Sequence, residues 1–191
     1  MLIKNKLIDV KERAVYVFGL ESLLLNSSEL IIIFIISLLF TDIRFFVTFI
    51  LVFLPLRLTG GGFHFSKSSV CFISSITMFV IAVLANNIYP KLYENNIYVI
   101  FTIILAVVLL LIAPVENKSN PLSDHKKKKN KVLFSSFLTV DVILLIIFKN
   151  LHLQPATGII IFVSCTSLLL FFGKLKAFED SLIEKNNKSN S

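Results

Sequence analysis

Long apolar runs separated by short polar segments dominate the chain. Four runs are clear, and they cover residues 70–89, 97–113, 132–148 and 155–172. Each is close to the ~20 residues that an α-helix needs to cross the hydrocarbon core of a bilayer. Prolines at positions 90, 114 and 155 lie at the ends of these runs, where a proline costs a helix least. The pattern therefore predicts four transmembrane helices in this part of the chain.

The preceding apolar region is interrupted by Asp42 and Arg44. A single span would bring both charges near the bilayer centre, at roughly 2.5–3.5 kcal/mol each. Two short spans, at about 28–40 and 44–56, avoid most of this cost, so we expect six spans in total. The apolar stretch Leu30–Phe40 rises only ~17 Å as a helix. The first span must therefore extend toward the N-terminus, thin the bilayer or pack behind other helices.

Residues 1–25 show the spacing of an amphipathic helix. Apolar residues recur every three or four positions, at Ile3, Leu7, Val10, Ala14 and Val17. Charged residues occupy the other faces, which is typical of a helix that lies in the membrane interface. A helix packed on a partner protein is the alternative.

Composition supports a membrane protein. Hydrophobic residues make up 55% of the 191 residues and charged residues only 16%, against about 45–50% and about 25% in soluble domains. A soluble core of this size cannot bury so much apolar surface. We expect one all-α, polytopic membrane domain over residues 1–191, with the interfacial helix followed by about six transmembrane helices.

The net charge of +7 fits a defined topology in the membrane. With six spans and a cytoplasmic N-terminus, all but three of the 19 basic residues face the cytoplasm, as the positive-inside rule requires. The loops 57–69 and 115–131 and the C-terminus are then cytoplasmic. A five-span arrangement would place the N-terminal basic residues outside. The block Lys126–Lys129 with Lys131 fits a topology determinant near anionic lipid, and we expect no nucleic-acid partner.

The loop 57–69 and the residues after it contain the densest cluster of special residues. Gly60, Gly61 and Gly62 allow positive φ angles and close backbone approach, and their N–H groups could hold a developing oxyanion. His64 follows, and Cys71 begins the third span. A thiolate in the first turn of a helix is stabilised by the helix dipole, and a histidine can act as its general base and acid. A buried thiol beside a structural histidine is the alternative.

The seven-residue spacing sets a condition on this pair. On an unbroken helix His64 and Cys71 would lie ~10.5 Å apart along the axis. The helix must therefore begin between them, and Ser68 or Ser69 is a suitable N-cap.

The pattern Arg57-x-x-x-Gly61-Gly62-x-His64, followed by Cys71, resembles the signature of the AgrB family (accessory gene regulator protein B). The resemblance implies a cysteine endopeptidase of the bacterial cell membrane in which His64 and Cys71 are catalytic. Its substrate would be an AgrD-type propeptide on the inner membrane surface. The propeptide's C-terminal tail would be removed through an acyl-enzyme thioester, and ring closure would give a thiolactone or lactone quorum-sensing pheromone. A homodimer is a further family expectation.

A second element agrees with this family. The segments Ala113–Lys118 and Asn120–Leu122 resemble the family's sequence after the fourth span. Chain length, basic loop and span pattern agree as well, so the resemblance covers nearly the whole chain. Phe65 departs from it, because a small residue often follows the family's histidine.

Other polar residues in or beside the spans have less specific roles. Arg57 could anchor an acidic part of the propeptide or orient the glycine loop, or it could reach the membrane surface from the end of the second span. Asp141 interrupts the fifth span and could orient His64, pair with a basic residue or make a structural contact. Cys165 is expected to be packing. His125 and His152 fall on opposite sides of the membrane, so we expect no metal site and no cofactor.

Two non-enzymatic functions compete with the protease. A peptide exporter or small transporter would show internal repeats and polar residues near the membrane centre. The chain has no evident repeat, and its polar cluster lies at an interface. A membrane-docked binding protein with a structural glycine loop is the second alternative.

Overall fold

The computed structural model describes residues 13–61, 68–115 and 124–189. The helices in chain order are α1 (Arg13–Phe40), α2 (Ile43–Thr48), the π-helix η1 (Phe49–Phe53), α3 (Leu54–Gly60), α4 (Ser68–Ile88), the 3₁₀-helix η2 (Leu92–Glu94), α5 (Asn96–Ile112), α6 (Asp124–Asn150) and α7 (Pro155–Ser189). The described ranges contain no strand, and a single bridge joins Gly61 to Val115. The expected all-α class is confirmed.

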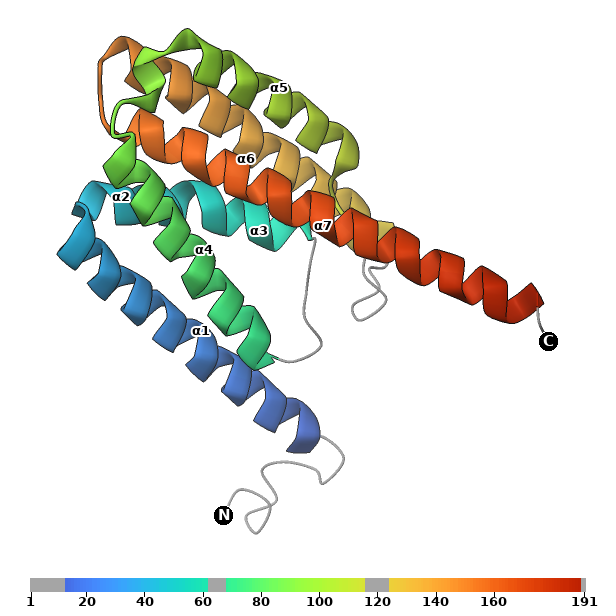
Figure 1. The fold of residues 1–191 in the computed structure, drawn as a ribbon. Coiled ribbons are helices and arrows are strands. Elements are labelled where there is room, and N and C mark those ends of the chain that lie inside the picture. Colours follow the sequence, from blue (N-terminus) through green and yellow to red (C-terminus); the bar gives the residue numbers. More distant parts are fainter. Residues whose placement is uncertain (1–12, 62–67, 116–123, 190–191) are drawn as a thin grey trace.

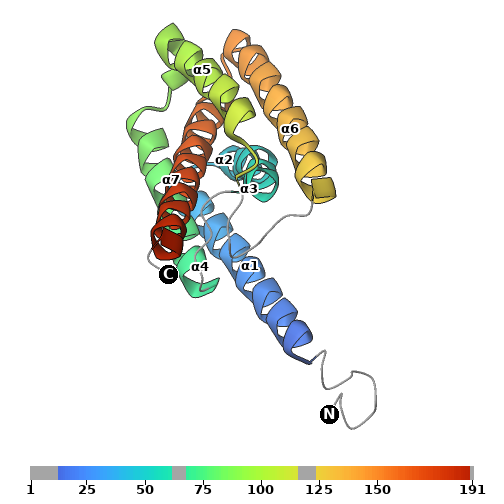
Figure 2. The same ribbon diagram turned by 90° about the vertical axis from the view of Figure 1, so that its right-hand side faces the viewer.

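The helices form two groups around a central helix. Helices α5, α6 and α7 pack together, α1 packs along α4, and the helix formed by α2, η1 and α3 contacts both groups (Figures 1 and 2). The C-terminal part of α7 projects beyond the other helices (Figure 1). The central helix is therefore positioned to connect the α1–α4 pair to the α5–α7 bundle.

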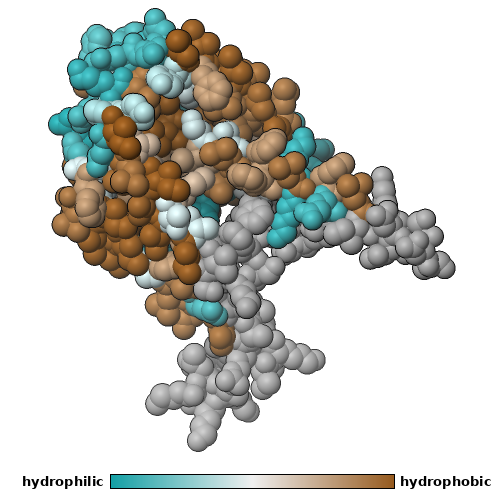
Figure 3. Space-filling view, in the orientation of Figure 1, coloured by the Kyte–Doolittle hydropathy of each residue, from teal (hydrophilic) through white to brown (hydrophobic). Residues whose placement is uncertain are grey.

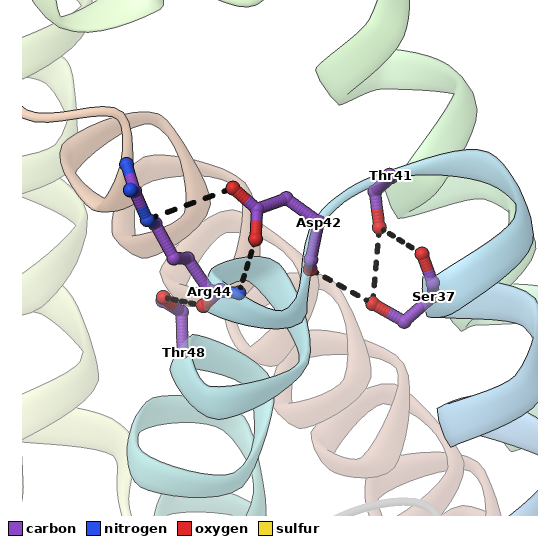
Figure 4. Close-up of polar contacts among 5 residues, drawn as sticks. All are labelled: Ser37, Thr41, Asp42, Arg44 and Thr48. Carbon is purple, nitrogen blue, oxygen red and sulfur yellow. Dashed lines mark hydrogen bonds and ion pairs between the residues drawn. The ribbon is translucent and has the colours of Figure 1, made fainter.

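The first two helices separate at the charged interruption. Helix α1 ends at Phe40, and Asp42 caps the next helix by accepting a hydrogen bond from the Arg44 N–H at 3.0 Å. The Ser37 hydroxyl lies 3.0 Å from the Thr41 hydroxyl and donates to the Asp42 carbonyl at 3.1 Å (Figure 4). These contacts satisfy polar groups at the break between the helices, where an unpaired group would be costly.

The first apolar helix extends toward the N-terminus. Its membrane-compatible part is Gly19–Phe40, with 22 residues, which is long enough to cross a membrane. Helix α1 is continuous through residue 25, where we placed the end of the interfacial helix. Residues 1–12 of that helix lie outside the described residues.

The central helix changes its winding before Pro55. Proline has no N–H and its ring collides with the carbonyl four residues earlier, so the regular hydrogen bond is lost there. The chain forms the π-helical turn Phe49–Phe53 instead, and the Leu54 N–H bonds to the Phe49 carbonyl. Phe49 and Phe53 are buried and pack with Phe79 of α4 and Phe162 of α7. This aromatic cluster forms the centre of the core.

Much of the outer surface is apolar, as Figure 3 shows on one face. Four helices are long and apolar enough to cross a membrane, and their membrane-compatible ranges are Gly19–Phe40, Ile43–Gly60, Asp124–Asn150 and Pro155–Lys176. Two shorter apolar helices cover Phe72–Ile88 and Asn96–Ile112. Apolar helices that expose large hydrophobic side chains require lipid around them. The chain is therefore a membrane protein, and the arrangement of six spans stays a prediction.

Two helices extend beyond the spans that the sequence predicts. Helix α6 begins at Asp124, so the block Lys126–Lys129 lies on the first turns of a helix rather than in a loop. Lysine has a good helix propensity, which allows the helix to continue through the basic block. Helix α7 continues to Ser189, beyond the expected end of the last span at residue 172.

Candidate active site

The end of α3 packs directly against the segment that follows α5. The Val115 N–H donates a hydrogen bond of 2.9 Å to the Gly60 carbonyl. A Cβ added to Gly60 would lie 2.7 Å from Cε2 of Phe134 on α6, which is closer than two non-bonded carbon atoms approach in proteins. The two segments that resemble the AgrB family are far apart in the sequence, and the hydrogen bond from Val115 to Gly60 shows that they meet in the structure. We call Gly60, Gly61 and Val115 the glycine end.

Gly61 requires glycine for two reasons. Its φ is +69°, in the region that residues with a side chain rarely adopt. A Cβ at this position would also lie 2.4 Å from the Val115 carbonyl oxygen. Gly61 therefore has the positive φ that the glycine run allows. The close backbone neighbour is the Val115 carbonyl of the same chain. Gly62 lies outside the described residues.

Cys71 belongs to the first turn of α4, whose described residues begin at Ser68. The N-terminus of a helix carries free N–H groups and a positive dipole, which favour a thiolate. His64 lies outside the described residues. The catalytic pair, and the condition that its spacing sets, stay predictions.

Arg57 lies on the last turn of α3 and reaches two other helices. Its Nη1 lies 3.7 Å from a carboxylate oxygen of Glu29 on α1 and donates a hydrogen bond to the Ser75 hydroxyl on α4. The Cζ atom of Arg57 lies over the ring of Phe53, 5.9 Å from the ring centroid. Only 18% of the Arg57 side chain and 16% of the Glu29 side chain are exposed. The guanidinium therefore lies between helices and is largely buried.

Glu29 and Ser75 were missed by reasoning from the sequence. An acid inside an apolar run is a functional candidate by default, and that signal singled out Asp141. Glu29 gave a weaker signal because we placed the first span at about 28–40, with Glu29 at its edge. Once the span begins at Gly19, Glu29 falls in its middle.

Asp141 lies in the interior of α6, with 3% of its surface exposed. Within the described part of the chain, its Oδ2 has no hydrogen-bond partner. Asp141 lies two turns along α6 from Phe134, about 10 Å along the axis. It therefore does not reach the Gly60 contact that Phe134 makes, and the described residues include no basic partner for it.

Cys165 lies in α7 and is buried in the core. The described residues contain no group of three or more His, Cys, Asp or Glu side chains that could hold a metal.

The described residues thus define a class of protein. It is an all-α membrane protein with a glycine end after α3, an ion pair between Arg57 and Glu29, and a cysteine in the first turn of α4. Comparison with known proteins gives the family. Residues 1–172 match the family model described as Accessory gene regulator B. The chain therefore belongs to the accessory gene regulator B (AgrB) family.

Individual relatives agree with this assignment. A putative AgrB-like protein of Clostridium beijerinckii is 28% identical over 90% of this chain and 82% of the relative. One from Listeria innocua is 32% identical over 74% of this chain and 70% of the relative. The accessory gene regulator protein B of Staphylococcus carnosus is 27% identical over 82% and 81% of the two chains. No solved structure matches the chain. Family membership assigns the protein a role in an accessory gene regulator (agr) quorum-sensing system with an AgrD-type partner.

Proposed function

We propose that the protein is a membrane-embedded cysteine endopeptidase that removes the C-terminal tail of an AgrD-type propeptide. Cys71 is the nucleophile and His64 is the general base and general acid. The observation that carries the proposal is the meeting of Gly60 with Val115, because it brings together the two segments that resemble the family. The first-turn position of Cys71 in α4 supplies the second support.

The first chemical step forms an acyl-enzyme. His64 takes the proton of Cys71, and the thiolate attacks the carbonyl carbon that precedes the propeptide tail. The C–N bond then breaks, and His64 gives its proton to the leaving amine. The tail departs, and the propeptide remains attached to Cys71 as a thioester.

The second step closes the pheromone ring. A cysteine or serine inside the propeptide loses its proton to His64 and attacks the thioester carbonyl. The bond to Cys71 breaks, the thiolate is regenerated, and a thiolactone or lactone is released. Enclosure by helices and lipid limits hydrolysis of the thioester by water.

The remaining candidates support the site rather than react. Gly60 and Gly61 set the path of the chain out of α3, and the N–H of Gly62 is a candidate oxyanion donor. Arg57 holds the end of α3 to the other helices. Asp141 is buried within α6 and takes no part in the reaction.

Cleavage in cells with targeted variants tests the proposal. Co-expressing the protein with a tagged AgrD-type propeptide should release the tail, and Cys71→Ala and His64→Ala should each abolish release. Cys165→Ala is the matched control, because it removes the buried cysteine of α7, and it should retain release. Continued release by both variants would refute the protease and leave the exporter or the binding protein as the function.

The orientation is part of the same proposal. We place the N-terminus, residues 57–69, residues 115–131 and the C-terminus in the cytoplasm, where the propeptide is made. In a Cys165→Ala background, a membrane-impermeant thiol reagent should label Cys71 in inside-out vesicles and not in intact cells. Labelling of Cys71 in intact cells alone would overturn the orientation.

A further inference from the structure

Three polar side chains from three helices meet between α1, α3 and α4. The Arg57 guanidinium pairs with the Glu29 carboxylate at 3.7 Å and donates to the Ser75 hydroxyl. Ser75 is 3% exposed. We call Glu29, Arg57 and Ser75 the three-helix polar cluster.

Two members of the three-helix polar cluster, Ser75 and Arg57, lie close in sequence to Cys71 and to Gly60. Ser75 follows Cys71 by four residues on α4, so the two positions are one turn apart on the same face of the helix. Arg57 lies on the last turn of α3, which ends at Gly60. The cluster therefore connects the first turns of the cysteine-bearing helix to the end of the glycine-bearing helix.

Glu29 supplies the charge that such a connection needs. Helix α1 packs against α4, whereas α3 packs mainly against η1 and α6, so the Arg57 side chain is what reaches from α3 to α1 and α4. Hydrogen bonds between helices help to hold them together inside a membrane. A buried ion pair is favourable only in good geometry and with additional hydrogen bonds, which here include the bond from Arg57 to Ser75. Removing the carboxylate would leave the guanidinium without its counter-charge in an apolar region, which favours movement of the Arg57 side chain away from Ser75.

We propose that Glu29 is a positioning residue: it holds Arg57 against Ser75 and thereby fixes the first turns of α4 relative to the end of α3. The consequence for catalysis rests on the proposed function of Cys71. Glu29 does not touch the substrate. It acts through Arg57 and Ser75, so its loss should change the rate of the chemical step more than substrate binding.

The positional half of the proposal is tested without catalysis. Spin labels are placed on Leu58 of α3 and Ile73 of α4, which are 71% and 61% exposed, in a variant whose two native cysteines are replaced by alanine. In lipid nanodiscs the distance distribution between the labels should be narrow. Glu29→Ala should broaden or shift it. An unchanged distribution in Glu29→Ala would overturn the proposal.

The catalytic half is tested by kinetics on a fluorescently tagged AgrD-type propeptide. Glu29→Ala should lower kcat by roughly tenfold to a hundredfold, the effect expected of a misplaced reacting group, with KM changed less than kcat. Glu29→Asp keeps the charge and should recover part of the rate. Glu29→Gln keeps the shape without the charge and serves as the second variant if Glu29→Ala does not assemble. Broadened distances with an unchanged kcat would overturn the link to catalysis.

A matched control separates charge loss in general from charge loss at this site. Glu94 pairs with Lys91 at 3.0 Å in an exposed ion pair beyond the ends of α4 and α5. Glu94→Gln makes the same chemical change as Glu29→Gln, and it should leave both the label distances and kcat unchanged. If Cys71→Ala cleaves as fast as the parent protein, the proposed function fails, whereas the spin-label result still decides whether Glu29 fixes α4.

Discussion

Arg44 and Arg57 each pair with an acid, but at opposite ends of the central helix and in different surroundings. Arg44 and Asp42 lie two residues apart, and 66% and 44% of their side chains are exposed (Figure 4). Arg57 and Glu29 belong to different helices, and only 18% and 16% are exposed. The first pair closes a turn, and the second connects helices that are distant in the sequence.

This difference extends to the neighbouring contacts. Beside Arg44, the hydroxyls of Ser37, Thr41 and Thr48 bond to atoms within five residues of themselves. Near Arg57, Gly60 and Gly61 contact the distant Val115. Exposed local ion pairs contribute about 0–1 kcal/mol, whereas breaking a buried pair is far more costly. The glycine end is therefore where substitutions should affect both folding and function.

Gly61→Ala should have the largest effect of the variants that test this comparison. The alanine would adopt an unfavourable positive φ and collide with the Val115 carbonyl oxygen, at a cost of about 3 kcal/mol. The thermal midpoint of the purified protein in detergent should fall, and propeptide cleavage should be lost. Gly19→Ala in α1, where a Cβ would meet no atom within 4 Å, is the matched control and should retain both. Equal stability of the two variants would contradict this reading of the glycine end.

Gly60→Ala should have the next largest effect. Its methyl group would overlap the ring of Phe134, and overpacking of this kind costs about 1–3 kcal/mol. Phe134→Leu shortens the opposing side chain and should restore part of the stability lost in Gly60→Ala. A double-mutant cycle on the thermal midpoints measures this coupling, and purely additive effects would show that the contact is not responsible.

Asp42→Ala tests the opposite end and should have a smaller effect. It removes the N-cap of α2, which is worth about 1 kcal/mol, together with an exposed ion pair. The thermal midpoint should fall slightly and propeptide cleavage should persist. Loss of cleavage in a variant that stays folded would show that the two ends are functionally equivalent, against the comparison.

Asp141→Asn should have the smallest effect. It tests whether cleavage depends on every buried acid or only on a buried acid that is paired, as Glu29 is with Arg57. Asp141 has no hydrogen-bond partner for Oδ2 among the described residues, and a neutral amide costs less to bury than a carboxylate. Cleavage should stay close to the parent rate, and thermal stability should be unchanged or higher. A strong loss of cleavage at unchanged stability would give Asp141 a role in the reaction.

Local sequence signals predicted the helices well. Burial of Asp42 and Arg44 at mid-bilayer is costly, so a break there could be inferred, and the structure has one between Phe40 and Ile43. Pro114 follows the end of α5 and Pro155 begins α7, as expected because a proline is tolerated best at the end of a helix. The start of the first apolar helix was harder to place, because the residues from Gly19 onward are compatible both with an interface and with a span.

Contacts between distant residues could not be predicted in the same way. The glycine run indicated positive φ, which the structure has at Gly61, but the partner Val115 depends on how α5 packs. Arg57 was singled out as a candidate, whereas Glu29 was not, because no local pattern links α1 to α3. The family resemblance identified candidate residues but not the residues that they contact. The structure shows that Arg57 contacts Glu29 and Ser75.

The central claim is that Cys71 carries the propeptide as a thioester. The most direct measurement is intact-protein and peptide mass spectrometry of the enzyme, trapped at low pH after brief mixing with an AgrD-type propeptide whose internal cysteine or serine is replaced by alanine. The account predicts an adduct on Cys71 with the mass of the propeptide without its tail, sensitive to hydroxylamine and absent in Cys71→Ala. Tail release without any such adduct, or an adduct on Cys165, would contradict it.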